Sequence, residues 1–117
     1  MGYNTDFEGQ FTLDHPLDEG EAKILHNFSE TRHEGYDAGP KLGYWCDWIP
    51  SEDGRAIIHN GGEKFYNYVG WLELLLEKFL IPWGYKLNGK VVWQGEDMED
   101  RGKIVVVDNV VSVTFLE

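Results

Sequence analysis

Residues 62–85 read GEKFYNYVGWLELLLEKFLIPWGY, and this stretch decides the fold. At about 100° per residue, one face of a helix collects its apolar side chains: Phe65, Tyr68, Val69, Leu72, Leu75, Leu76, Phe79 and Leu80. Pro82 cannot continue a helix, and it disfavours the helical state of the residue before it. We therefore predict a helix that begins at Glu63 and ends at residues 80–81. On its other side, Trp71 and Leu74 either pack on another helix or form an exposed interface.

Composition and charge narrow the class of protein. The 117 residues fit one domain, and an aromatic content of 15%, with five Trp, supports a packed core. The net charge of -11 argues against direct nucleic-acid binding, which needs clustered Lys and Arg, and it suits a basic protein partner. Cys46 is the only cysteine, apolar runs are shorter than a membrane span, and residues 1–10 lack a signal-peptide pattern. We expect a soluble cytoplasmic protein that does not bind membranes.

The N-terminal third predicts a strand and then a helix. Residues 3–13 alternate apolar and polar side chains, which is typical of a half-buried strand. Its expected core face carries Tyr3, Thr5, Phe7, Phe11 and Leu13. Gly9 on this face marks either a bulge or a close approach of another element. Asp18 then has the position of an N-cap, with Glu21 as its capping-box partner. The helix that follows has an apolar stripe of Ile24, Leu25 and Phe28 and ends near Thr31.

The remaining segments predict strands joined by tight turns. Residues 43–49 and 55–59 are expected strands on either side of a turn at 50–54. Asn88–Gly89 favours a two-residue hairpin between strands at 85–87 and 90–93, and Asp108–Asn109 favours a second one. The second turn pairs Ile104 with Val113 and Val106 with Val111. The element order is then β-α-β-β-α-β-β-β-β, which predicts a single α+β domain with a mainly antiparallel sheet and two helices on one face.

The last hairpin has a second apolar face. This face carries Val105, Val107, Val110, Ser112 and Thr114. It is more apolar than open solvent requires, so we expect a loop, the N-terminal strand or a partner to cover it.

The sequence contains no catalytic signature and implies no cofactor. The densest acidic cluster, GEDMEDRG, offers carboxylates to a hard cation such as Ca²⁺ or Mg²⁺: Glu96, Asp97, Glu99 and Asp100. Its spacing does not match an EF-hand loop, so a solvated loop is the preferred interpretation. Cys46 alternates with Tyr44 and Trp48, which indicates a buried structural thiol. The four His lack the spacing of zinc ligands.

Three groups of residues are candidates for binding a partner. Asp6 and Glu8 project together from the first strand, and no Lys or Arg precedes Lys23, so a basic partner surface suits them. Trp45 and Asp47 share the strand face opposite Cys46, and Trp71 and Leu74 form the third group. An alternative function is a small enzyme or ligand-binding domain with a pocket near Trp45, Asp47 and the segment from His59 to Glu63.

Several phrases together resemble a family of small proteins found in bacteria and in phages or prophages. They are GYNTDFEGQF, YWCDWIPSEDG, GGEKFYNYVGWL, PWGYKLNGKVVWQGED and GKIVVVDNVV, and they span nearly the whole chain. The resemblance implies no activity or catalytic residue. It favours an accessory protein that binds a host factor. We therefore expect a non-catalytic protein-interaction module and leave open whether it forms a homo-oligomer.

Overall fold

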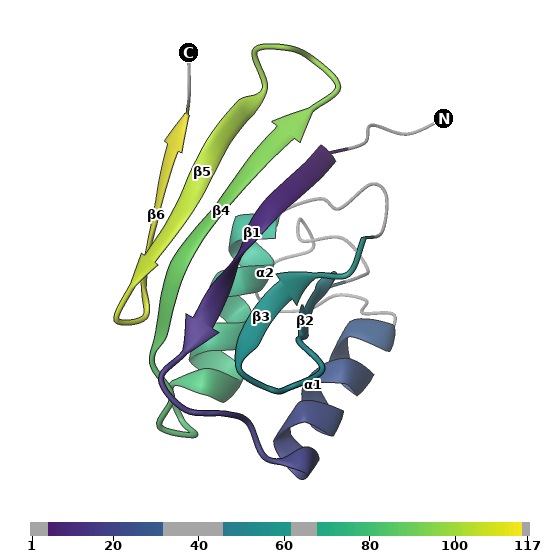
Figure 1. Ribbon diagram of the computed structural model, residues 1–117, viewed down its shortest axis with the longest axis vertical. Coiled ribbons are helices and arrows are strands. Elements are labelled where there is room, and N and C mark those ends of the chain that lie inside the picture. Colours follow the sequence, from purple (N-terminus) through teal and green to yellow (C-terminus); the bar gives the residue numbers. More distant parts are fainter. Residues whose placement is uncertain (1–4, 32–45, 62–67, 116–117) are drawn as a thin grey trace.

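The computed structural model describes residues 5–31, 46–61 and 68–115, which form one six-stranded antiparallel sheet and two helical segments (Figure 1). The strands are β1 (Thr5–Leu13), β2 (Trp48–Pro50), β3 (Ala56–His59), β4 (Leu87–Gly95), β5 (Arg101–Val107) and β6 (Val110–Phe115). The helices are α1 (Glu19–Glu30) and α2 (Tyr68–Leu75), and α2 continues directly as the π-helix η1 (Leu76–Leu80). The predicted α+β class is confirmed, and the element order is β-α-β-β-α-β-β-β.

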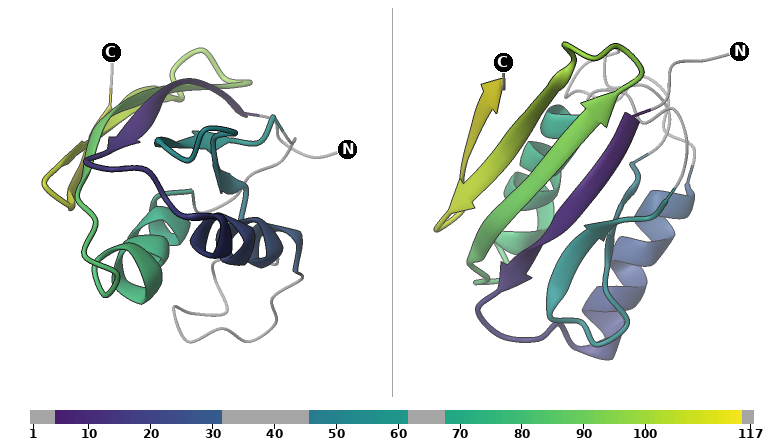
Figure 2. Two further views of the ribbon diagram at one scale, coloured as in Figure 1. Left: turned by 60° about the horizontal axis from the view of Figure 1, so that its bottom comes forward. Right: turned by 45° about the horizontal axis from the view of Figure 1, so that its top comes forward.

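The sheet has the strand order β2-β3-β1-β4-β5-β6, and both helices lie on one of its faces (Figure 2). We call the uncovered side the open face. Between sheet and helices lies one core of buried side chains that both layers supply. Its largest members are Trp48, Trp71, Trp93, Phe11, Leu25 and Ile57. The alternation predicted for the first strand is confirmed, because Thr5, Phe11 and Leu13 are buried while Asp6 and Glu8 are exposed.

The long helix ends at Leu80, as predicted. Its last turn is widened: the Ile81 N–H bonds the Leu76 carbonyl at 2.8 Å, five residues back, immediately before Pro82. The predicted start at Glu63, with Phe65, lies outside the described residues. Trp71 is completely buried and meets Phe28 of α1 edge-to-face, with ring centroids 5.9 Å apart. The packing alternative therefore holds for Trp71, and Leu74 is half-buried against the same core.

The first helix begins as predicted. The Asp18 carboxylate accepts the Glu21 N–H at 2.7 Å, and the Glu21 carboxylate accepts the Asp18 N–H at 3.2 Å. Leu25 and Phe28 are buried, but Ile24 is 46% exposed, so its place in the stripe was wrong. The buried stripe of α1 runs through Leu25, Phe28 and Ser29 and leaves Ile24 outside it.

The hairpin predicted at Asn88–Gly89 is wrong, and the sheet has six strands instead of seven. β4 runs without a break from Leu87 to Gly95 and pairs with β1 along the whole length of both strands. A Cβ on Gly89 would lie 2.6 Å from the Gln10 carbonyl oxygen of β1, and one on Gly9 would lie 2.5 Å from the Lys90 carbonyl oxygen of β4. The two glycines thus permit a close approach of two central strands. For Gly9 this is the close-approach alternative, since the register contains no bulge.

The Asp108–Asn109 turn is confirmed. Both residues have positive φ, 45° and 71°, as a type I′ hairpin requires. The predicted pairs Ile104–Val113 and Val106–Val111 are both present. The strand predicted at 43–49 is observed from Trp48, because residues 46–47 are not in a strand, and residues 43–45 lie outside the described part. That strand also extends through Pro50, which the edge of the sheet tolerates.

Candidate interaction site

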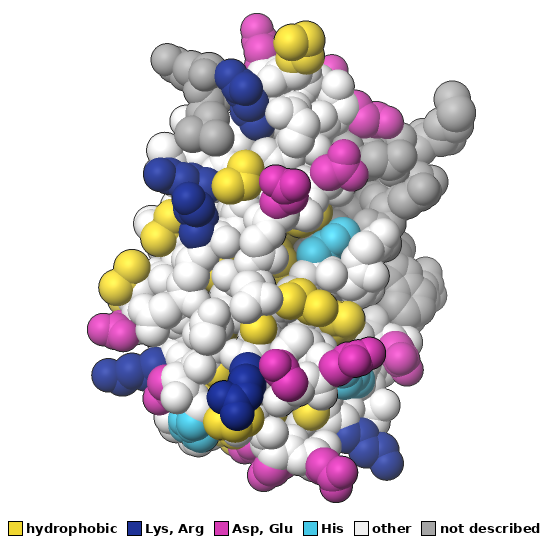
Figure 3. Space-filling model, viewed as in Figure 1, with side chains coloured by type: hydrophobic (Ala, Val, Ile, Leu, Met, Phe, Trp, Pro, Cys, Tyr) yellow, Lys and Arg dark blue, Asp and Glu magenta, His cyan; other side chains and the backbone are white. Residues whose placement is uncertain are grey.

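The open face carries both acidic and basic side chains. Asp6 and Glu8 project together from β1, as predicted, but bases stand two strands away in the same rows. Asp6 pairs with Gln94, which pairs with Arg101, and the row of Glu8 similarly leads to Lys103. Figure 3, which views this face, shows basic and acidic side chains distributed among one another. Asp6 and Glu8 therefore belong to a face of mixed charge and do not form a purely acidic surface for a basic partner.

The segment around Asp47 and His59 is packed against the core. Burial raises the pKa of the Asp47 carboxyl, against the effect of a hydrogen bond from the Asn60 side chain. Burial also lowers the pKa of His59, whose ring lies 4.4 Å from that of Phe7. The His59 Nδ1 accepts the Gly61 N–H at 3.2 Å. The other members of the predicted pocket, Trp45 and Glu63, lie outside the described residues. The described part of this segment therefore does not add support to the enzyme alternative.

Cys46 has the environment of a structural thiol. Its side chain has 0% exposure, and burial raises its pKa to about 12. The thiolate, which is the nucleophilic form, is therefore strongly disfavoured in the folded protein. The predicted burial of Cys46 is confirmed.

The acidic loop between β4 and β5 does not assemble a metal site. Within residues 5–31, 46–61 and 68–115, no group of three or more His, Cys, Asp or Glu side chains is arranged to hold a metal ion. Asp97, Glu99 and Asp100 line a shallow hollow with Met98, while Glu96 is exposed beside them. Asp100 accepts a hydrogen bond of 3.0 Å from the Trp93 indole N–H, which ties the loop to the core.

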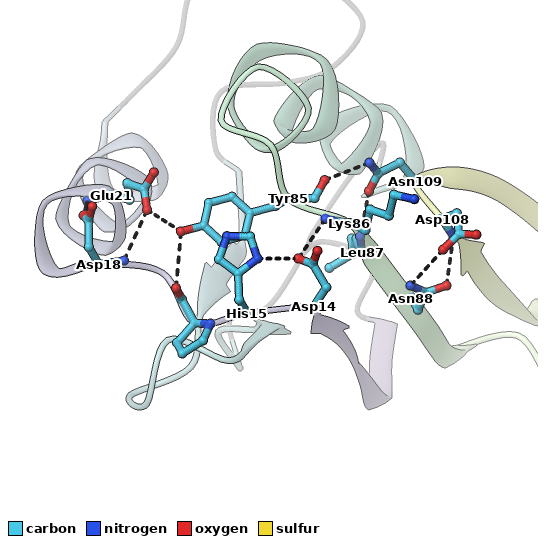
Figure 4. A network of polar contacts seen from close by, with 11 residues as sticks. Asp14, His15, Asp18, Glu21, Tyr85, Lys86, Leu87, Asn88, Asp108 and Asn109 are labelled. Atoms are coloured by element: carbon cyan, nitrogen blue, oxygen red, sulfur yellow. Dashed lines mark hydrogen bonds and ion pairs between the residues drawn. The ribbon is translucent and has the colours of Figure 1, made fainter.

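A polar network around Tyr85 was not predicted from the sequence (Figure 4). The Tyr85 hydroxyl donates to the Glu21 carboxylate of the capping box, and the His15 ring stacks on the Tyr85 ring at 4.1 Å. His15 Nδ1 lies 2.8 Å from Asp14 Oδ1. Burial and the Glu21 carboxylate raise the pKa of Tyr85 to about 12, so the phenol stays neutral at ordinary pH. The network joins the start of α1 to the segment that precedes β4, and we assign it a structural role.

The same network explains the missing hairpin. The Asn109 side-chain amide donates to the Tyr85 carbonyl at 2.9 Å, and its oxygen accepts the Leu87 N–H at 2.6 Å. Asn88 in turn accepts the Asp108 N–H at 2.8 Å. The backbone at 85–88 is thus held by the β5–β6 turn and by β1. It therefore cannot fold back on residues 90–93, as the predicted hairpin would require. No spacing signal in the sequence could have found contacts between residues so far apart.

Exposed apolar side chains gather on the edge strand β6, at the end of the described sheet opposite β2. Val110 is 69% exposed, Phe115 is 71% exposed and Val113 is 37% exposed. No charged residue occurs from Val110 to Phe115. Because β6 is last in the described strand order, alternate backbone N–H and C=O groups along it point away from β5 without a neighbouring strand. Among the described elements, neither the helices, which lie on the other side, nor β1, which lies within the sheet, covers the second apolar face of this hairpin.

A small hollow lies beside β6 on the helix side. It has a volume of about 290 Å³ and is lined by Tyr68, Val69, Gly70, Trp93, Val113 and Phe115. The Trp93 ring lies over Gly102, where a Cβ would be 2.4 Å from the indole, and meets the Phe115 ring edge-on at 5.4 Å. The edge strand and the start of α2 thus form one continuous apolar site, which we call the β6 site.

Within the part of the chain that the structure describes, no helix is long and apolar enough to cross a bilayer. No protein-family model, curated protein or solved structure matches the chain.

Proposed function

We propose that the protein is a non-catalytic protein-interaction module and that the β6 site is its binding element. The observation that carries the proposal is an exposed, apolar and uncharged strand at the edge of the sheet. An extended segment of a partner adds to such an edge through backbone hydrogen bonds, and pockets for alternate side chains select its sequence. The hollow between α2 and β6 is such a pocket.

The two edges of the sheet support this assignment by their contrast. Edge strands of stable proteins are usually protected by short length, proline, charged side chains or bulges, because an open edge invites aggregation. β2 has two of these protections, since it is three residues long and ends in Pro50. β6 has six residues, no charge and no proline. An edge left open in this way is explained by a partner that uses it.

The resemblance to small phage and prophage proteins adds a context in which the partner is a host protein. A cytoplasmic location belongs to the same proposal. The mixed charges of the open face support a role in orientation: Asp6 and Glu8 would meet basic groups of a partner, while Lys103 and Arg101 would meet acidic ones.

A displayed library of random decapeptides, selected on the immobilised protein, tests the proposal. We expect selected peptides to alternate apolar residues and to shift the NMR amide signals of residues 110–115. Thr114→Lys places a charge on the exposed edge and should weaken their binding by about tenfold or more. Thr12→Lys is the matched control, because it makes the same change on the same face in a central strand. Peptides that bind both variants equally, or that shift other amides, would contradict the proposal.

A further inference from the structure

We infer that the extended segment added to β6 is β6 of a second copy of this chain. The two strands would pair antiparallel about a two-fold axis that passes between the two Val113 residues, which we call the axis through Val113. The pairing would join two six-stranded sheets into one of twelve strands. This inference rests on the proposed function, because it names the partner of the same site. An interface with two-fold symmetry must be complementary to itself, and the side chains of β6 meet that condition.

The order of side chains along β6 decides the register. With the axis through Val113, Val111 of one copy faces Phe115 of the other, Ser112 faces Thr114, and Val113 faces its own counterpart. Every apolar side chain then meets an apolar one on the helix side, and hydroxyl meets hydroxyl on the open face. Aromatic with β-branched and Ser with Thr are pairings that stabilise antiparallel strands.

Neighbouring registers lack this match. An axis through Ser112 would set Val110 against Thr114 and Phe115 against Asn109. Side chains alternate between the two faces of a strand, and residues directly opposite each other point to the same face. Only registers in which one residue faces its own counterpart therefore keep the helices of both copies on the same side of the joined sheet. The axis through Val113 therefore gives the best pairing among these.

The charge distribution favours a second copy for the same edge. In a symmetric contact the same surface patch comes from both copies, so a chain of net charge -11 would bring acidic side chains against acidic ones over much of its surface. From Val110 to Phe115 the chain offers no charge at all. Two copies can thus approach along β6 without a direct like-charge contact in the paired segment. Pairing also shields Val113 and Phe115, which are 37% and 71% exposed in the single chain.

Engineered cysteines test this arrangement directly. The native Cys46 is completely buried, so a cysteine introduced on the surface will react in its place. In Val113→Cys, the two thiols face each other across the axis and should form an intermolecular disulfide under mild oxidation. We expect it to cross-link about tenfold or more faster than Thr12→Cys, whose thiol is exposed in a central strand. Sedimentation of the unmodified protein should show a species of twice 13.5 kDa that dissociates on dilution.

Charge reversal distinguishes a second copy from any other partner. Val113→Lys and Val113→Glu should each sediment as monomers, because like charges would face each other across the axis, whereas an equimolar mixture should recover the dimer. Should either variant lose its cooperative melt, the double variants Ser112→Lys with Thr114→Lys and Ser112→Glu with Thr114→Glu replace them, since these two positions are exposed and face each other between the copies.

Two results would overturn the inference. One is a chain that stays monomeric at every concentration without a Val113→Cys cross-link, and the other is a dimer that Val113→Lys leaves intact. If decapeptides still bind β6 in the first case, self-pairing alone has failed. The proposed function fails separately, when peptides do not bind this edge. If self-pairing holds, any host partner must compete with the second copy for β6.

Discussion

Substitution of Gly89 by Ala tests the close contact of β1 with β4. The Cβ would lie 2.6 Å from the Gln10 carbonyl oxygen and 3.0 Å from Phe11 Cα, at a φ of +143°. Both contacts are with backbone, so no side chain can rotate away. Gly84→Ala is the control, because Gly84 also has positive φ, +88°, but nothing lies within 4 Å of its Cβ position.

The two variants separate backbone strain from crowding. Placing an L-residue at positive φ costs about 1–2 kcal/mol, which we expect for both. Crowding against a packed strand adds about 1–3 kcal/mol for Gly89→Ala alone. At about 4 °C per kcal/mol for a domain of this size, Gly89→Ala should melt about 4–12 °C below Gly84→Ala.

Thermal unfolding followed by circular dichroism measures this difference. Urea titration provides a second measure, in which a change of midpoint at constant slope reports stability alone. Equal melting temperatures for the two variants would refute the close approach of the strands. That outcome would instead fit a hairpin at Asn88–Gly89, where the added methyl group would face solvent.

Three further predictions concern the core, the thiol and the phenol. Leu72→Asp puts an unpaired carboxylate at a site with 0% exposure and should abolish the cooperative melt. The control Ile24→Asp, at a site with 46% exposure, should keep it. A cooperatively melting Leu72→Asp protein would contradict the core assignment. At pH 8, native Cys46 should react with iodoacetamide about a thousandfold more slowly than in urea, because its pKa is raised from 9.0 to about 12; similar rates would exclude its burial. The folded state keeps the Tyr85 proton up to about pH 12, while the unfolded chain loses it near 10, so stability present below pH 10 is lost between pH 10 and 12. Tyr85→Phe should be less stable at pH 7 by about 1–2 kcal/mol, because it cannot donate a hydrogen bond to Glu21. In melts at increasing pH it should lack the loss of stability that ionisation of Tyr85 causes. An unchanged alkaline profile would refute the assignment.

Several elements were predictable because their signals are local. The capping box of Asp18 and Glu21 lies within four residues, and the Asp108–Asn109 turn needs only two residues that accept positive φ. The apolar arc of the long helix and the alternation of β1 follow directly from the periods of helix and strand. In each case the physical cause acts between neighbours along the chain.

The site was less predictable than the fold. The sequence marked the last hairpin as too apolar for solvent, and this is the hairpin that forms the β6 site. It also left open whether Trp71 forms an interface or packs on a helix, and the burial of Trp71 against Phe28 shows that it packs on a helix. The exposure of a side chain depends on which elements lie beside it, so the pattern alone could not separate these cases.

The sequence determined the helices, the alternating strands and the last turn, because those structures depend on hydrogen bonds and side-chain spacing within a few residues. Only the tertiary structure decided the state of Asn88–Gly89, since β1 and the Asn109 side chain reach it from distant parts of the chain. Only the strand order of the described residues placed β6 at an edge, where alternate backbone groups point away from β5. The physical reason is that an edge is defined by the absence of a neighbouring strand, and non-local pairing alone decides which strand that is.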